Sequence, residues 1–148
     1  MHNLSWIVSL SLTLATLSAF PYGQSSPPRP KADVLARGKY IVDRVSMCGD
    51  CHTPRGEKGE PVAEKYLQGA DLGVEPTIPI PGFARLAPDI TAKALTRWSA
   101  EDLAKAFEVG KRPNGEPFRP PMPGYRMDRK DAEAVAVYLK SLEPGSSK

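Results

Sequence analysis

The chain has few of the side chains that build most metal sites and catalytic centres: two cysteines and two histidines among 148 residues. A zinc site with four protein ligands is disfavoured, because one histidine, His2, lies in a segment expected to be removed. The net charge of +3 is too small to indicate a nucleic-acid partner. We see no internal repeat and no alternating run long enough to build a sheet.

Long apolar runs are also scarce, and Leu4–Phe20 is the main one. It is at the short end for a membrane span and is interrupted by serines and threonines. The run predicts a secretory signal over residues 1–23, cleaved between 18 and 24, although no lysine or arginine precedes it. An uncleaved membrane anchor is the alternative. A linker over 24–32 then leaves residues 33–148 as one domain, with no room for a second catalytic domain.

Both cysteines belong to one motif. Cys48, Cys51 and His52 form the pattern C-x-x-C-H, the signature of covalent attachment of a c-type haem. Two thiols on one turn can bond to the same porphyrin, and the following histidine can ligate the iron beneath it. The alternatives are a thioredoxin-like redox motif, which needs a βαβ setting, a zinc site, or a structural disulfide closing an unusually short loop. We therefore expect one covalently attached haem c.

A first helix is predicted over about 33–46, where Leu35, Ile41 and Val45 recur at near-helical spacing. Gly38 lies in its middle. A mid-helix glycine costs about 1 kcal/mol relative to alanine, so it needs a packing reason. Close approach of another helix would supply that reason.

Capping residues predict two further helices. Ser99 and Asp102 form an acidic capping box, and Gly110 ends the helix Ala100–Val109 that they begin. Asp128 begins a final helix in the same way. One apolar stripe marks this final helix, which Pro144 and Gly145 should end: Ala132, Val135, Leu139 and Leu142.

From residue 53 to 96 the chain is rich in proline and glycine and has no sustained period. So long a loop is unusual in a compact domain, unless its apolar residues cover a large cofactor. The residues expected to do so are Tyr66, Leu67, Ile78, Ile80, Phe83 and Leu86. The predicted fold class is all-α, with long loops around the haem.

The second axial position of the iron decides between electron transfer and small-molecule chemistry. Met1 is lost with the signal, and Met47 adjoins Cys48 on the side of His52. Met127 is better explained as a staple residue of the final helix. Met122 is bracketed by prolines that fix its backbone, and we expect its thioether to be the second ligand.

The mature chain resembles a class I cytochrome c, and within that class the cytochrome c domains that serve bacterial periplasmic dehydrogenases. The resemblance is carried by the stretches 37–40, 48–55, 66–69, 87–91, 97–103, 110–112, 121–123 and 134–142. It implies a cytochrome c fold, in which the terminal helices cross around a covalently bound haem.

The resemblance also implies roles for single residues. Cys48 and Cys51 would attach the haem, and His52 and Met122 would ligate its iron. Gly38 would lie where the last helix crosses the first, against Tyr138 or Leu139. A proline carbonyl after the motif would accept the Nδ1 proton of the histidine, and Pro61 is the expected one by its order in the chain.

These features predict a periplasmic monohaem electron carrier that docks transiently on a dehydrogenase or oxidase subunit and does not itself catalyse a reaction. It would contact a membrane only if the N-terminal segment stays uncleaved. The alternatives are a haem enzyme or gas sensor with an open distal site, to which Tyr125 or Arg126 would contribute, and a structural subunit of a dehydrogenase complex. Several cations could steer an acidic partner or form an ordinary solvated surface: Arg55, Lys58, Lys111, Arg112, Arg119 and Arg126.

Overall fold

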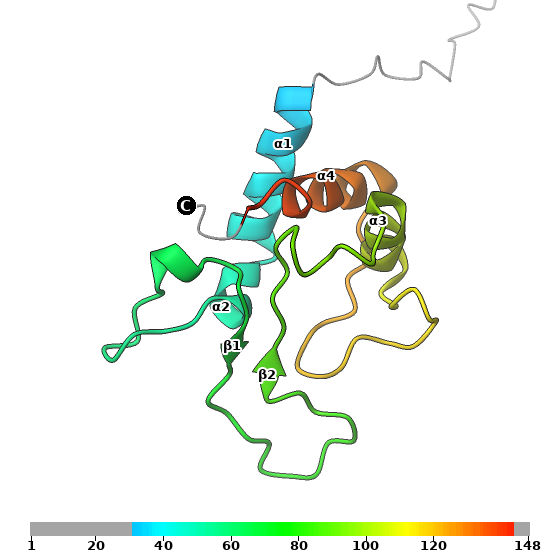
Figure 1. The fold of residues 1–148 in the computed structure, drawn as a ribbon. Coiled ribbons are helices and arrows are strands. Elements are labelled where there is room, and N and C mark those ends of the chain that lie inside the picture. Colours follow the sequence, from blue (N-terminus) through cyan, green and yellow to red (C-terminus); the bar gives the residue numbers. More distant parts are fainter. Residues whose placement is uncertain (1–30, 144–148) are drawn as a thin grey trace, which may run out of the picture.

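The computed structural model describes residues 31–143, so the expected signal, most of the linker and the helix stop at Pro144 and Gly145 lie outside the described residues. The α-helices of this part are α1 (Lys31–Tyr40), α2 (Cys48–His52), α3 (Ala100–Val109) and α4 (Arg129–Leu139). Strands β1 (Ala70–Asp71) and β2 (Leu86–Ala87) lie between α2 and α3. In Figure 1, α4 crosses α1 and lies beside α3, and the loops extend from one side of this helical group. None of the helices among residues 31–143 is both long enough and apolar enough to cross a membrane.

Helix α1 crosses α4 at Gly38, which is buried. A Cβ atom added to Gly38 would lie 2.1 Å from the carbonyl oxygen of Ala134 and 2.7 Å from Cβ of Tyr138. The expected packing against Tyr138 is confirmed, and the backbone of Ala134 comes closer still. Beside the crossing, Arg37 donates two hydrogen bonds to the carboxylate of Asp131, at 2.9 and 2.7 Å. The glycine is therefore needed because two helix backbones meet there.

Helix α1 continues into a π-helical turn, η1 (Ile41–Val45). Ile41 and Val42, at the start of this turn, are buried, whereas Val45, at its end, is 56% exposed. Val45 therefore does not share the buried face of Ile41, although the two recur at near-helical spacing in the sequence. A π-turn holds more residues than an α-turn, so it rotates its last residue, Val45, away from the face that Gly38 and Val42 share.

The capping residues of α3 and α4 are confirmed. The hydroxyl of Ser99 accepts a hydrogen bond from Asp102 N at 3.0 Å, and the Asp102 carboxylate accepts one from Ser99 N at 3.0 Å. Gly110 ends α3 in the left-handed conformation, with φ of 71°. Asp128 caps α4, which ends at Leu139, earlier than expected, in a tight turn closed by Leu142 N and Leu139 O. The apolar stripe of the final helix is buried as predicted: Ala132, Val135, Leu139 and Leu142.

Replacing Ser99 with alanine should lower the free energy of unfolding by about 1 kcal/mol, because the first turn of α3 then loses a hydrogen-bond acceptor. Chemical denaturation followed by circular dichroism measures this loss. Thr96→Ala is the matched control, since Thr96 is exposed and its side chain makes no hydrogen bond among the described residues. Equal stability of the two variants would contradict a stabilising cap.

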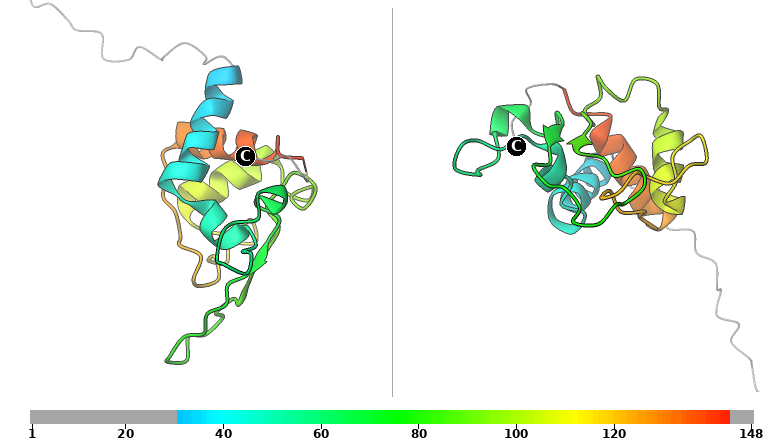
Figure 2. Two further views of the ribbon diagram at one scale, coloured as in Figure 1. Left: turned by 90° about the vertical axis from the view of Figure 1, so that its left-hand side faces the viewer. Right: turned by 90° about the horizontal axis from the view of Figure 1, so that it is seen from below.

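The long loop contains the one sheet of the described chain, which the sequence did not predict. Ala70 pairs with Ala87 and Asp71 with Leu86, antiparallel. Two residues per strand are too few for an alternating pattern to appear in the sequence. Tyr66 and Leu67 are buried as expected, whereas Ile78, Ile80 and Leu86 are exposed in the polypeptide. The segment between β1 and β2 extends away from the helices (Figure 2).

Candidate haem-binding site

Both cysteines and the histidine of the motif lie in one short helix, α2. Met47 precedes it in the left-handed conformation, with φ of 48°, so the chain turns sharply into the motif. Both thiols are free, which excludes the disulfide alternative in this structure. Cys48 is buried, and burial raises the pKa of its thiol to about 12, whereas Cys51 is exposed. The two thiols are thus presented on one turn, as the motif predicts.

The imidazole of His52 is buried and held in one orientation. Its Nδ1 lies 2.7 Å from the carbonyl oxygen of Pro88. A carbonyl oxygen can only accept, so Nδ1 carries the proton and Nε2 keeps its lone pair. Nε2 has no hydrogen-bond partner among the described residues. Burial lowers the pKa of His52, and the bond to Pro88 acts in the opposite direction. His52 is therefore a neutral imidazole in which the lone pair of Nε2 is free. This is the form of histidine that ligates a metal.

The acceptor for His52 is Pro88, so the expectation of Pro61 is wrong. Residues 54–62 form a loop that closes on itself: Val62 N donates to Pro54 O at 2.9 Å, and Arg55 bridges to Pro61. This closure keeps Pro61 beside Arg55. Pro88 directly follows β2, whose pairing with β1 returns the chain to α2. Pro88 lies in the stretch 87–91 that carries the resemblance, but order in the chain favours Pro61, which is nearer to His52.

An open hollow of about 270 Å³ adjoins α2 on the side of Cys51. Binding sites for small molecules and cofactors typically have volumes of roughly 300–1,000 Å³, so the volume of this hollow is close to the lower end of that range. Pro121, next to Met122 in the chain, borders the hollow from another direction. The space therefore lies between the attachment helix and the methionine loop. Its lining residues are Asp50, Cys51, Thr53, Arg55, Ala70, Asp71, Leu72, Val74 and Pro121.

Met122 lies in a turn closed by its own amide, which donates to Arg119 O at 3.0 Å. Its side chain is half-buried and packs against the apolar core. Arg119 ties this loop to the segment before β2, since its Nε donates to Gly82 O at 3.0 Å. Ala84 N completes the tie by donating to Pro120 O at 2.6 Å. The loop is thus tied at two points to the segment 82–84. The role of Met122 as an iron ligand stays a prediction.

Tyr125 and Arg126 were the residues named for an open distal site. The hydroxyl of Tyr125 donates to Ser46 O at 3.0 Å, and burial raises the pKa of this tyrosine. Arg126 is exposed and donates to Gly124 O at 3.4 Å. The Tyr125 hydroxyl is therefore engaged by the protein backbone, whereas Arg126 uses one of its five guanidinium N–H groups in this way.

These residues fit a covalently attached haem. Two free thiols lie on one helical turn, an imidazole with a free Nε2 follows them, and an open hollow adjoins Cys51. Within residues 31–143, no three His, Cys, Asp or Glu side chains are grouped so that they could hold a bare metal ion. The donor set is that of a haem protein whose tetrapyrrole supplies the remaining ligands.

A model of the family described as cytochrome c matches residues 35–143. The chain belongs to the cytochrome c family. This cytochrome c therefore carries a covalently attached haem c, and it is an electron-transfer haem protein of helical fold. The sequence-based prediction of the family and of its cofactor is confirmed.

The relatives of this cytochrome c include cytochrome subunits of bacterial dehydrogenases. It is 31% identical to the fructose dehydrogenase cytochrome subunit of Gluconobacter japonicus, over 72% of this chain and 21% of that protein. It is 31% identical to the gluconate 2-dehydrogenase cytochrome c subunit of Pantoea cypripedii, over 95% and 34%. The cytochrome c subunit of the quinone alcohol dehydrogenase of Gluconobacter oxydans is 28% identical, over 95% and 31%. The chain thus spans between about a fifth and a third of the length of these relatives.

Proposed function

We propose that this cytochrome c carries single electrons in the periplasm, between a dehydrogenase and a downstream acceptor, with its haem iron held by His52 and Met122. The observation that carries the proposal is the imidazole of His52, which Pro88 fixes at 2.7 Å so that Nε2 is free to ligate. When bound, the haem supplies one-electron chemistry between ferrous and ferric iron. Cys48 and Cys51 would hold it permanently, so that it is not lost between transfers.

The protein contributes rigidity on both sides of the proposed haem. The bond from His52 to Pro88 orients the imidazole, and the ties from Arg119 and Ala84 hold the loop of Met122. Ligands that stay in place in both oxidation states keep the reorganisation small, and a thioether favours the ferrous form. This arrangement supports an electron carrier over an enzyme with an open iron.

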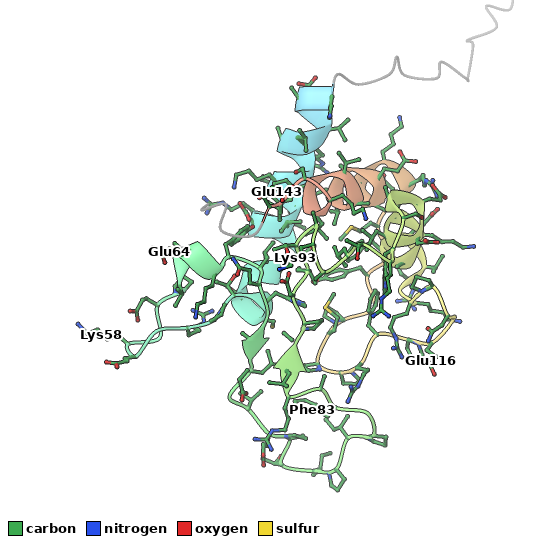
Figure 3. The ribbon with its side chains drawn as sticks, in the orientation of Figure 1. Lys58, Glu64, Phe83, Lys93, Glu116 and Glu143 are labelled. Carbon is green, nitrogen blue, oxygen red and sulfur yellow. The ribbon has the colours of Figure 1, made fainter. Side chains whose placement is uncertain are left out.

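The dehydrogenase partner is proposed from the names of the relatives, which are cytochrome subunits of fructose, gluconate and alcohol dehydrogenases. The periplasmic location is proposed from the apolar run Leu4–Phe20, because haem is attached outside the cytoplasm in bacterial proteins of this kind. Two of the cations expected to steer a partner, Lys58 and Arg112, lie on opposite sides of the molecule (Figure 3). Lys58 extends from the tip of the 54–62 loop, across the molecule from Glu116, which pairs with Arg112 (Figure 3).

Replacing Met122 with alanine should remove the methionine-to-iron charge-transfer band from the spectrum of the oxidised protein and lower its reduction potential, since the ferrous form loses its soft ligand. Met47→Ala is the matched control, because Met47 is 56% exposed and adjoins Cys48. Spectra of both oxidation states and a redox titration measure these effects. An unchanged spectrum in the Met122 variant would exclude this ligand. Rapid binding of carbon monoxide by the reduced wild type would instead indicate an open distal site.

A further inference from the structure

His52 is held at two points by two segments that are themselves joined. Its Nδ1 donates to Pro88 O at 2.7 Å, and its backbone oxygen accepts a hydrogen bond from Gly69 N at 2.8 Å. The residues next to these two partners, Ala70 and Ala87, pair with each other in the small sheet. The histidine, β1 and β2 thus form one closed hydrogen-bonded unit. A shift of β1 within this unit also shifts the Pro88 carbonyl, which accepts the hydrogen bond of the imidazole.

Within this unit, the backbone of Gly69 packs tightly against the backbone of residues 87–89. Its φ is +85°, a conformation that favours glycine. A Cβ at this position would lie 2.8 Å from Asp89 N, 2.9 Å from Ala87 O and 3.0 Å from the carbonyl carbon of Pro88. All three are backbone atoms, and they belong to the segment that carries the acceptor for His52. A side chain at position 69 must therefore push the Pro88 carbonyl away from its present place.

Thr53 fixes the residues that directly precede Gly69. Its buried hydroxyl accepts a hydrogen bond from Leu67 N at 3.0 Å. Leu67 is fully buried and has a φ of +58°, which is uncommon for a residue with a side chain. The oxygen of Leu67 accepts a bond from Ile90 N at 3.0 Å, so the strained residue also joins the segment beyond Pro88. Strain of this kind persists where the surroundings over-determine it.

We propose that Gly69 and the hydroxyl of Thr53 are positioning residues that set the hydrogen bond between His52 Nδ1 and Pro88, and through it the reduction potential of the iron. The inference rests on the proposed function, in which His52 ligates the iron. A hydrogen bond to the outer nitrogen increases the electron donation of the imidazole, and this stabilises the ferric state. Weakening the bond should therefore raise the potential while the ligands stay the same.

The first test compares Gly69→Ala with Gly59→Ala. Gly59 has nearly the same φ, +83°, but a Cβ there would meet nothing within 4 Å. The two variants therefore carry the same conformational penalty, and only Gly69→Ala displaces the Pro88 carbonyl. We expect Gly69→Ala to raise the ratio of ferrous to ferric protein about tenfold at a fixed applied potential, which is about 59 mV for one electron. Gly59→Ala should titrate like the wild type.

The second test replaces Thr53 with valine, which keeps the shape and removes the hydroxyl, or with serine, which keeps the hydroxyl. The valine variant should raise the potential and move the nuclear magnetic resonance signal of the His52 Nδ1 proton, and the serine variant should restore both. If Gly69→Ala yields no holoprotein, the two Thr53 variants test the inference on their own. Potentials and proton signals that are equal to wild type in both Gly69→Ala and Thr53→Val would overturn the inference.

The optical spectrum of the wild type distinguishes a failure of the positioning role from a failure of the proposed function. A wild-type spectrum without histidine and methionine ligation would contradict the electron-carrier proposal and, with it, the premise of the positioning role. A normal wild-type spectrum, combined with potentials that do not move, would contradict the positioning role alone.

Discussion

Replacing both Cys48 and Cys51 with alanine should abolish covalent haem attachment and leave a chain without its native tertiary packing. These are the only cysteines in the sequence, so no other thiol can take their place. Much of the segment from Thr53 to Thr96 is exposed in the polypeptide, including Ile78 at 68% and Leu86 at 65%, so apolar cover on this side depends on the cofactor. Extraction with acid and organic solvent, followed by haem staining of a denaturing gel, measures attachment. Near-ultraviolet circular dichroism measures packing.

The single variants Cys48→Ala and Cys51→Ala are the controls for this experiment. Each should retain one thioether bond and therefore keep haem on the polypeptide after extraction. Cys48→Ala should be the less stable of the two, because Cys48 is buried in the core cluster and Cys51 is exposed. Haem that stays bound to the double variant after extraction would show that attachment occurs elsewhere.

Replacing Gly38 with alanine should lower the free energy of unfolding by about 2 kcal/mol or more. Alanine gains about 1 kcal/mol of helix propensity over glycine. Against this, an added atom in a packed core costs about 1–3 kcal/mol, and a contact of 2.1 Å with a backbone oxygen places this one at the upper end or beyond. The net effect is therefore a loss, measured by denaturant titration of the holoprotein.

Ala36→Ser is the control for the crossing, because it adds one heavy atom to an exposed position of the same helix. It should change stability by less than about 0.5 kcal/mol. A Gly38→Ala protein that is as stable as wild type would mean that α1 and α4 can separate at little cost. The matching measurement is the hydrogen-exchange protection of α1, which should fall in the Gly38 variant and not in the control.

Local chemistry made the helices predictable. Ser99, Asp102 and Gly110 define both ends of α3 through contacts within a few residues, and the structure places these ends where the sequence predicts them. The crossing at Gly38 was also predictable, since an unfavourable glycine inside a helix implies a close neighbour. The π-turn η1 was not, because nothing in the sequence signals the insertion of a residue into a turn, and the near-helical spacing of Ile41 and Val45 therefore does not show that they lie on different faces.

The attachment motif was readable because its chemistry lies within five consecutive residues. The partner of His52 was not, because it depends on a pairing of two-residue strands that brings a segment 36 positions away back to the histidine. The sequence assigns no positioning role to Gly69 or Thr53 for the same reason. A glycine that is required by a non-local contact looks, in the sequence, like any glycine of a loop.

The ion pair between Arg37 and Asp131 joins residues 94 positions apart. For α1 to gain this partner, the chain must close a loop that spans most of its described length, and the entropy of closure is lost before any contact compensates it. Domains dominated by such distant contacts fold more slowly than those built from local ones. We therefore expect the crossing of α1 and α4 to slow the folding of this cytochrome as well as to stabilise it.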